Sequence, residues 1–113
     1  MSDTIRFSTD ADGIATLVID VPGQSMNVIG AQFLTDLEAA IDRISGDESV
    51  KGAVIASGKD SGFMAGMDLK GMEAMLLPPA GETLDMKTLF GRVFELNRIL
   101  RRLETCGKPV ACA

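Results

Sequence analysis

The sequence predicts a single small α/β domain, or a piece of a larger one. Two strand patterns open the chain, an amphipathic helix pattern joins the second of them to a further strand, and a longer helix pattern precedes a last strand. Helices of this length between strands are typical of right-handed β-α-β crossovers in an α/β layer. Of the 113 residues, 46% are hydrophobic, which is enough for a buried core.

The first half of the chain reads as a hairpin, a helix and a strand. Residues 5–8 alternate apolar and polar side chains, residues 10–13 form a turn, and residues 14–21 are rich in Ile, Val and Thr. An amphipathic helix is predicted from about residue 30 to residue 44, because apolar side chains recur there every three or four residues. These side chains are Phe33, Leu34, Leu37, Ile41 and Ile44. Residues 50–56 return to a strand pattern.

The second half is predicted to contain a long helix and the opening of another strand. A Pro-Pro-Ala-Gly break occupies residues 78–81, and Thr83 is a candidate cap for the helix that follows. The apolar stripe of this helix is Met86, Leu89, Phe90, Val93, Leu96, Leu100 and Leu103. Gly107 and Pro109 end it. Residues 110–113 resemble the first part of a buried strand, so we expect the sequence to stop inside a core.

Charged side chains on the last helix admit two interpretations. The basic ones are Arg92, Arg98, Arg101 and Arg102. The plain interpretation is a solvated face that Glu95 and Glu104 balance, and the alternative is a partner surface in an oligomer.

Composition excludes several classes of function. The net charge of −5 argues against nucleic acid or an anionic membrane as a partner, because both require a basic surface. No apolar run approaches the roughly 18 to 20 residues of a membrane span, and residues 1–10 lack the pattern of a secretion signal. We therefore expect a cytoplasmic protein.

The chain contains no histidine and two cysteines. The first fact removes Ser-His-Asp and Cys-His catalysis and most zinc chemistry from these residues. Cys106 and Cys112 are too few for a disulfide framework or a metal site, and no metal is predicted. Both thiols are interpreted as buried apolar side chains.

The stretch 57–72, which reads SGKDSGFMAGMDLKGM, follows a buried-strand pattern and leads into a short helix pattern. Gly66 lets the backbone approach a ligand closely, and Asp68 is a good N-cap for a helix over residues 69–75. The N–H of Met67 would then lie just outside a helix N-terminus, where it can stabilise an oxyanion.

Other interpretations of this stretch are weaker. Its glycines do not fit G-x-G-x-x-G, and the Lys-Ser/Thr pair of a P-loop is missing, so no nucleotide fingerprint is predicted. Clustered methionine is more often core than a pliable ligand wall, and both interpretations apply to Met64, Met67, Met72 and Met75.

Residues 54–72 resemble the first acyl-CoA-binding loop of the crotonase, or enoyl-CoA hydratase/isomerase, superfamily, through SGK, FMAGMDL and the Lys that follows. Residues 12–17 resemble the opening hairpin of that family, Asn27 the Asn before its first helix, and residues 108–111 the lead-in to its next core strand. The resemblance implies one domain over residues 1–113, the N-terminal portion only of a crotonase-like ββα superhelix. Residues 22–28 are most similar to the hydratase region of multifunctional β-oxidation proteins, in which a 3-hydroxyacyl-CoA dehydrogenase follows.

The resemblance also implies a site. The N–H of Met67 matches the first of two donors that hold the thioester carbonyl, and the backbone at Ala65 and Gly66 matches the part that holds the adenine end of CoA. Met67 and Asp68 belong to the same loop and are included in the predicted CoA-binding site. Lys59 and Lys70 are the nearest cations for CoA phosphates, with a solvated surface lysine as the alternative for each.

By resemblance, the parent protein is an enoyl-CoA hydratase of fatty acid β-oxidation and an expected homo-oligomer. The second donor and the catalytic carboxylates are absent, so the chain alone is predicted to be inactive. No cofactor is expected in this region, since CoA arrives as the substrate thioester and NAD would belong to a downstream dehydrogenase. Alternatives are another crotonase reaction, such as isomerisation, hydrolysis or decarboxylation, and a non-catalytic interaction module.

Overall fold

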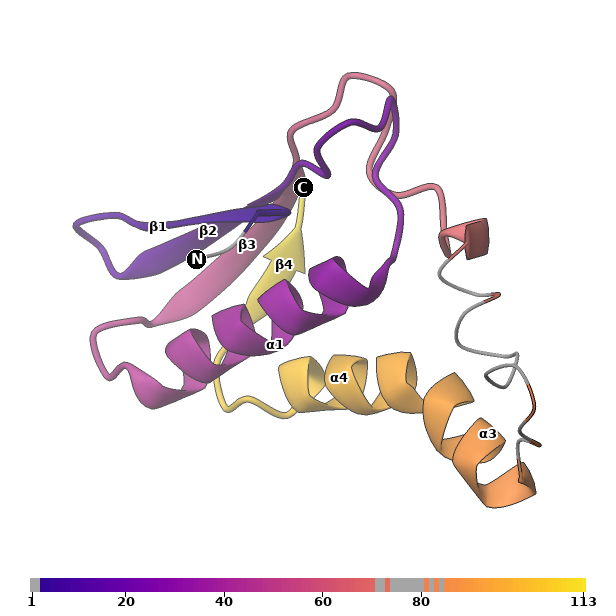
Figure 1. Cartoon of the computed structure of the whole chain (residues 1–113). Coiled ribbons are helices and arrows are strands. Elements are labelled where there is room, and N and C mark those ends of the chain that lie inside the picture. The colour runs from indigo at the N-terminus through magenta and orange to yellow at the C-terminus, as the bar shows by residue number, and fades with distance from the viewer. Residues whose placement is uncertain (1–2, 71–72, 74–80, 82, 84) are drawn as a thin grey trace.

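A mixed sheet forms the centre of the computed structural model, which describes residues 3–70, 73, 81, 83 and 85–113. Within these residues the sheet has the order β1-β2-β3-β4 (Figure 1). The hairpin strands β1 (Ile5–Thr9) and β2 (Ile14–Ile19) pair antiparallel, whereas β3 (Gly52–Ser57) runs parallel to β2 and β4 (Val110–Cys112) runs parallel to β3. The α/β class predicted from the alternating patterns is confirmed.

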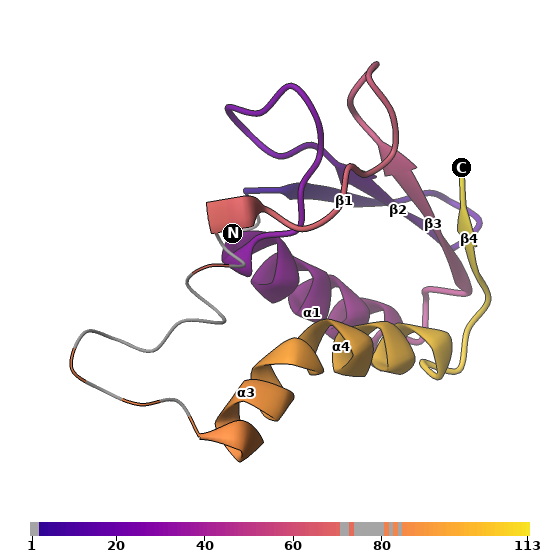
Figure 2. The same cartoon turned by 90° about the vertical axis from the view of Figure 1, so that its right-hand side faces the viewer.

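The first helix, α1 (Ala31–Gly46), connects β2 to β3 and covers one face of the sheet (Figure 2). Its apolar side chains pack against alternate residues of β2, of which Ala15 and Leu17 are fully buried. This arrangement is what an amphipathic helix and a half-buried strand produce together. The core members that the helix contributes are Phe33, Leu37, Ala40, Ile41 and Ile44. The predicted helix and strand therefore lie within two residues of the observed ones.

The long helix predicted after residue 83 is two helices, α3 (Met86–Val93) and α4 (Glu95–Glu104). The prediction of Thr83 as the cap is wrong. Asp85 has extended backbone, and its carboxylate accepts the N–H of Thr88 at 2.7 Å, so the helix begins after Asp85. Phe94 ends α3 and begins α4.

The apolar stripe predicted for this region is largely exposed. α3 extends away from the sheet (Figure 1), and its Met86 and Phe90 are 77% and 62% exposed. Ile99 of α4, which the stripe did not include, is 1% exposed because α4 packs beside α1. Phe90 and Phe94 stack on each other, with ring centroids 4.2 Å apart.

Two of the arginines assigned to a solvated face instead join α4 to α1. Arg98 contacts Glu38 of α1 at 2.6 Å as well as its helix neighbour Glu95, and Arg102 contacts Glu38 at 3.4 Å. Arg102 also pairs with Asp42 of α1. Such exposed ion pairs contribute little to stability, because water and salt screen them.

The cysteine prediction is wrong for Cys112, which is exposed, and Cys106 is only partly buried. In the described part of the chain β4 is an edge strand, because it pairs with β3 alone, and nothing covers Cys112. The core interpretation of methionine is confirmed for Met64, which packs against the core. Met72 and Met75 lie outside the described residues, as do residues 78–80 and most of the helix predicted over residues 69–75. No helix in the described ranges has the length and apolar character needed to span a membrane.

Ile99 should carry most of the stability that α4 adds to the fold. We expect Ile99→Ala to lower the free energy of unfolding by about 2–5 kcal/mol, because it leaves a cavity between α4 and α1. The matched change Leu100→Ala, at a neighbouring position that is 46% exposed, should cost about 0.5 kcal/mol. Urea unfolding followed by circular dichroism measures both, and equal losses would contradict the packing described for Ile99.

The chain should also self-associate. The edge strand β4 presents unpaired backbone groups, and α3 presents Met86, Phe90 and Val93 to solvent, two features that favour contact with other chains. Sedimentation velocity at high micromolar concentration measures this, and a clean monomer there would argue against it.

Candidate functional site

Two loops lie side by side beyond the carboxyl ends of β2 and β3 (Figure 1). They run like paired strands, because the N–H of Ala65 bonds the carbonyl of Asn27 at 2.8 Å and the N–H of Ile29 bonds the carbonyl of Gly66 at 2.8 Å. The N–H of Asp68 then bonds the carbonyl of Ile29 at 2.9 Å. The carboxyl edge of parallel strands is where α/β folds most often bind ligands, so this loop pair is the candidate site.

The N–H of Met67 faces away from the loop that pairs with it. In the bridge between Ile29 and Met67, the groups that face Ile29 are the carbonyl of Gly66 and the N–H of Asp68. The N–H of Met67 therefore lies on the opposite side of the backbone, and no described residue accepts a hydrogen bond from it. At the edge of the sheet where α/β folds bind ligands, an N–H in this orientation can donate a hydrogen bond to an acceptor oxygen of a ligand.

Gly66 makes this orientation achievable. In a regular extended chain the N–H groups of Ala65 and Met67 would face the same side, yet only that of Ala65 faces Asn27. Gly66 has φ of 122°, a conformation that residues with a side chain rarely adopt, and this reverses the direction of the next N–H. A Cβ at Gly66 would point into open space, which leaves room for a ligand against the backbone.

Asp68 caps the short helix that begins at Leu69, as predicted. Its Oδ1 accepts the N–H of Lys70 at 3.3 Å, and its Oδ2 lies 3.8 Å from where a Cβ of Gly30 would be, next to the start of α1. A carboxylate near two helix N-termini is favoured by both helix dipoles. The side chain of Asp68 thus supports the loop, and its part in binding CoA stays a prediction.

Lys59 differs from the solvated surface lysine considered as an alternative. Its side chain is only 15% exposed, and its ammonium contacts Oδ1 of Asp20 at 2.8 Å and the carbonyl of Val21 at 2.7 Å. Arg6 holds the other oxygen of Asp20 at 2.9 Å, so the hydrogen bonds from Lys59 and then from Arg6 lower the pKa of Asp20 below its ordinary value. Lys70, in contrast, is exposed. A phosphate role stays a prediction for both lysines, and of the two only Lys70 has no ion-pair partner among the described residues.

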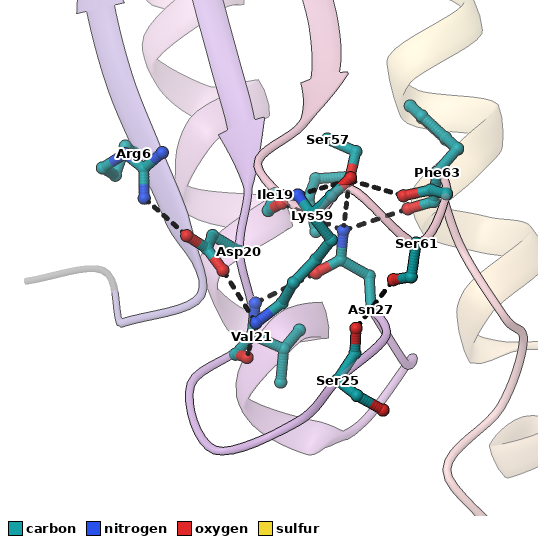
Figure 3. Close-up of polar contacts among 11 residues, drawn as sticks. Arg6, Ile19, Asp20, Val21, Ser25, Asn27, Ser57, Lys59, Ser61 and Phe63 are labelled. Carbon is teal, nitrogen blue, oxygen red and sulfur yellow. Dashed lines mark hydrogen bonds and ion pairs between the residues drawn. The ribbon is translucent and has the colours of Figure 1, made fainter.

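Asn27 is the residue that reasoning from residue patterns missed as a structural centre (Figure 3). It is 1% exposed, and its Nδ2 lies 3.0 Å from each of three oxygens, on Ile19, Ser57 and Phe63. Its Oδ1 accepts the N–H of Val21 at 3.0 Å. One amide therefore joins the ends of β2 and β3 to both loops, a set of contacts that neither hydrophobic periodicity nor local spacing encodes.

Serine hydroxyls add further links between the loops. Ser57 accepts from Asn27 and from the N–H of Lys59 at 3.0 Å each, and donates to the carbonyl of Gly62 at 2.6 Å. Ser61 donates to the carbonyl of Ser25 at 2.7 Å. The bonds of Ser57 hold its own loop against the end of β3, and the bond from Ser61 joins this loop to the one that contains Ser25.

The pocket between the loops is small. It has a volume of about 70 Å³ and is lined by Met26, Asn27 and residues 61–65. Sites for small molecules usually enclose at least about 300 Å³, so this pocket would hold only a fragment of an acyl-CoA.

Comparison with known proteins identifies the relatives of this chain. A family model described as enoyl-CoA hydratase/isomerase matches residues 9–110. The fatty acid oxidation complex subunit alpha of Shewanella amazonensis is 36% identical over all 113 residues, and that of Shewanella oneidensis is 38% identical over the same length. The chain spans about 15% of the length of each of these two relatives and aligns with their N-terminal part.

Solved structures with the same fold include an enoyl-CoA hydratase from Shewanella pealeana, with a TM-score of 0.81 and 17% identity. The alignment covers 99% of this chain and 39% of that one. An enoyl-CoA hydratase/isomerase from Marinobacter aquaeolei gives a TM-score of 0.78 at 21% identity, covering 96% of this chain and 40% of the other. The partial crotonase-like fold expected from the resemblance is thereby confirmed. Because the family match runs from the hairpin through the paired loops to β4, the chain belongs to the enoyl-CoA hydratase/isomerase, or crotonase, family.

Proposed function

We propose that this chain supplies the first thioester-binding loop of an enzyme that hydrates 2-enoyl-CoA in fatty acid β-oxidation. The proposal depends on the orientation of the N–H of Met67. No described residue accepts a hydrogen bond from this N–H, and it faces away from the loop that contains Ile29. Family membership supports a CoA thioester as the ligand. The names of the relatives, fatty acid oxidation complex subunit alpha, support β-oxidation as the setting.

The chemistry requires such a donor. When water adds across the C2–C3 double bond of an enoyl thioester, its oxygen bonds to C3 while a base removes one of its protons, and the π electrons of the double bond move toward the carbonyl to give an enolate. A proton then adds to C2 and restores the carbonyl. An N–H fixed at the carbonyl oxygen stabilises the enolate more than the ground state, and the loss of one such donor typically costs about 2.7–4 kcal/mol.

The remaining parts of the loop have separate roles in this proposal. The backbone at Ala65 and Gly66 contacts the CoA moiety, and Lys70 is the cation that meets its phosphates. Lys59 acts indirectly, since its ammonium is bound to Asp20 and Val21. The second donor and the carboxylates that transfer protons come from other parts of a complete family domain.

The wider assignments follow from the resemblance of residues 22–28 to the hydratase region of multifunctional β-oxidation proteins. A 3-hydroxyacyl-CoA dehydrogenase that uses NAD would accompany the hydratase on one polypeptide, and the assembled protein would be a cytoplasmic homo-oligomer that binds acyl-CoA and no nucleic acid. The net charge of −5 is consistent with the last point.

Substitutions at Met67 test the proposed donor in a complete family domain that carries this segment. Met67→Pro removes the N–H, so turnover of crotonyl-CoA should fall at least about a hundredfold. Met67→Ala keeps the N–H, so turnover should stay within about tenfold of the parent. Circular dichroism checks that both variants fold. A folded Met67→Pro enzyme of normal activity would show that this loop does not hold the thioester oxygen.

A second test uses the 113-residue chain by itself. Its described residues include one proposed oxyanion donor, and we assign no acid or base among them, so we expect no hydration of crotonyl-CoA above the rate in buffer. The decrease in enoyl absorbance measures the reaction. Turnover by the purified chain would mean that the described residues hold more of the catalytic apparatus than we assign to them.

A further inference from the structure

We infer that Asn27 is a positioning residue for the oxyanion donor, acting on the N–H of Met67 through the backbone that pairs with it. This inference rests on the proposed function and deepens it. The hydrogen bonds of Asn27 go to Ile19, Val21, Ser57, Phe63 and Ala65 and not to Met67, so its role differs from that of the donor itself.

The side chain of Asn27 attaches its own loop to the sheet. Its Oδ1 accepts the N–H of Val21, and its Nδ2 donates toward Ile19 at the end of β2 and toward Ser57 at the end of β3. Its Nδ2 also lies 3.0 Å from the carbonyl oxygen of Phe63, in the opposite loop. The amide has two N–H groups for these three oxygens, so they share its hydrogens within a site that is 1% exposed.

The main chain that Asn27 anchors then sets the direction of the donor loop. Its carbonyl accepts the N–H of Ala65, and two residues further on Ile29 bonds both groups that flank Met67. If the segment from Asn27 to Ile29 shifts, the groups bonded to it shift with it, and the N–H between them changes direction. A misplacement of about 1 Å at a reacting group can cost about a hundredfold in rate.

Only a neutral amide satisfies this position. Aspartate would keep the acceptor for Val21 but would place a negative charge against the oxygens of Ile19, Ser57 and Phe63. An apolar side chain would remove the donor to the carbonyl of Phe63, whereas Ile19 would keep the N–H of Gly58 and Ser57 the N–H of Lys59. Asn27→Asp is therefore the closest change in shape that removes the anchoring function.

Asp36 provides a matched control. It is also buried, at 4% exposed, and it accepts from the N–H of Thr4 at 3.0 Å and from the hydroxyl of Thr4 at 2.6 Å. These contacts attach the start of β1 to α1. Asp36→Asn should thus lower the melting temperature without acting on the loop that carries Met67.

Amide hydrogen exchange in the 113-residue chain tests the anchoring. The readout is the exchange ratio, defined as the exchange rate of the N–H groups of Ala65 and Asp68 divided by that of Leu17 in β2. In Asn27→Asp this ratio should rise at least tenfold, because the loop opens without global unfolding. In Asp36→Asn this ratio should stay at its original value. If Asn27→Asp accelerates exchange at all three positions by the same factor, its effect is general destabilisation and the inference is wrong.

A double-variant cycle in a complete family domain tests the role. If Asn27 acts through the N–H of Met67, Asn27→Asp should lower kcat at least tenfold alone and less than threefold in a Met67→Pro background. Losses that multiply would overturn the inference. Normal activity of Met67→Pro alone would instead refute the proposed function, while the exchange ratio would still report whether Asn27 anchors the loop.

Ser57→Ala keeps the inference testable if Asn27→Asp does not fold. It removes the hydroxyl that accepts from Asn27 and donates to Gly62, and it leaves the amide in place. We expect the same rise in the exchange ratio and the same non-additivity with Met67→Pro, to a smaller degree. A Ser57→Ala chain with an unchanged ratio would contradict the inference.

Discussion

The parallel pairing of β2 with β3 is the constraint on which the rest of this structure depends. Its register sets Ile19 opposite Ser57, so the chain leaves both strands at the same edge of the sheet and the two loops must share the space beyond it. α1 crosses between the strands and buries the face that they share. Once the loops are neighbours, their backbone groups need partners, and the loops provide them for each other.

Backbone geometry, more than side-chain chemistry, defines the candidate site. The proposed donor is the N–H of Met67, its direction follows from the φ of 122° at Gly66, and the pairing with Ile29 holds it. Fixed backbone donors need no reorganisation when charge develops on a bound oxygen. The charged groups nearby are used to hold the loops, since Lys59 and Arg6 both bind Asp20.

Local features of the sequence were sufficient for much of this fold. Periodicity located the hairpin, α1 and β3 to within about two residues, because apolar spacing reports which face of an element is buried. The N-cap at Asp68 followed from its place before a helical stretch. Local patterns did not distinguish between neighbouring candidate caps, so the prediction placed the helix cap at Thr83 when Asp85 provides it. The same patterns predicted a single helix across Phe94, where α3 ends and α4 begins.

By itself, the sequence determined the α/β class, the family resemblance and the loop around Met67, since each depends on residues that are near one another along the chain. The tertiary structure alone decided that Ile99 is buried, that Cys112 lies exposed on an edge strand, and that Lys59 is paired. It also decided the role of Asn27. Lys59 bonds a carbonyl 38 positions away and Asn27 bonds one 36 positions away, and such partners become neighbours only when β2 and β3 align.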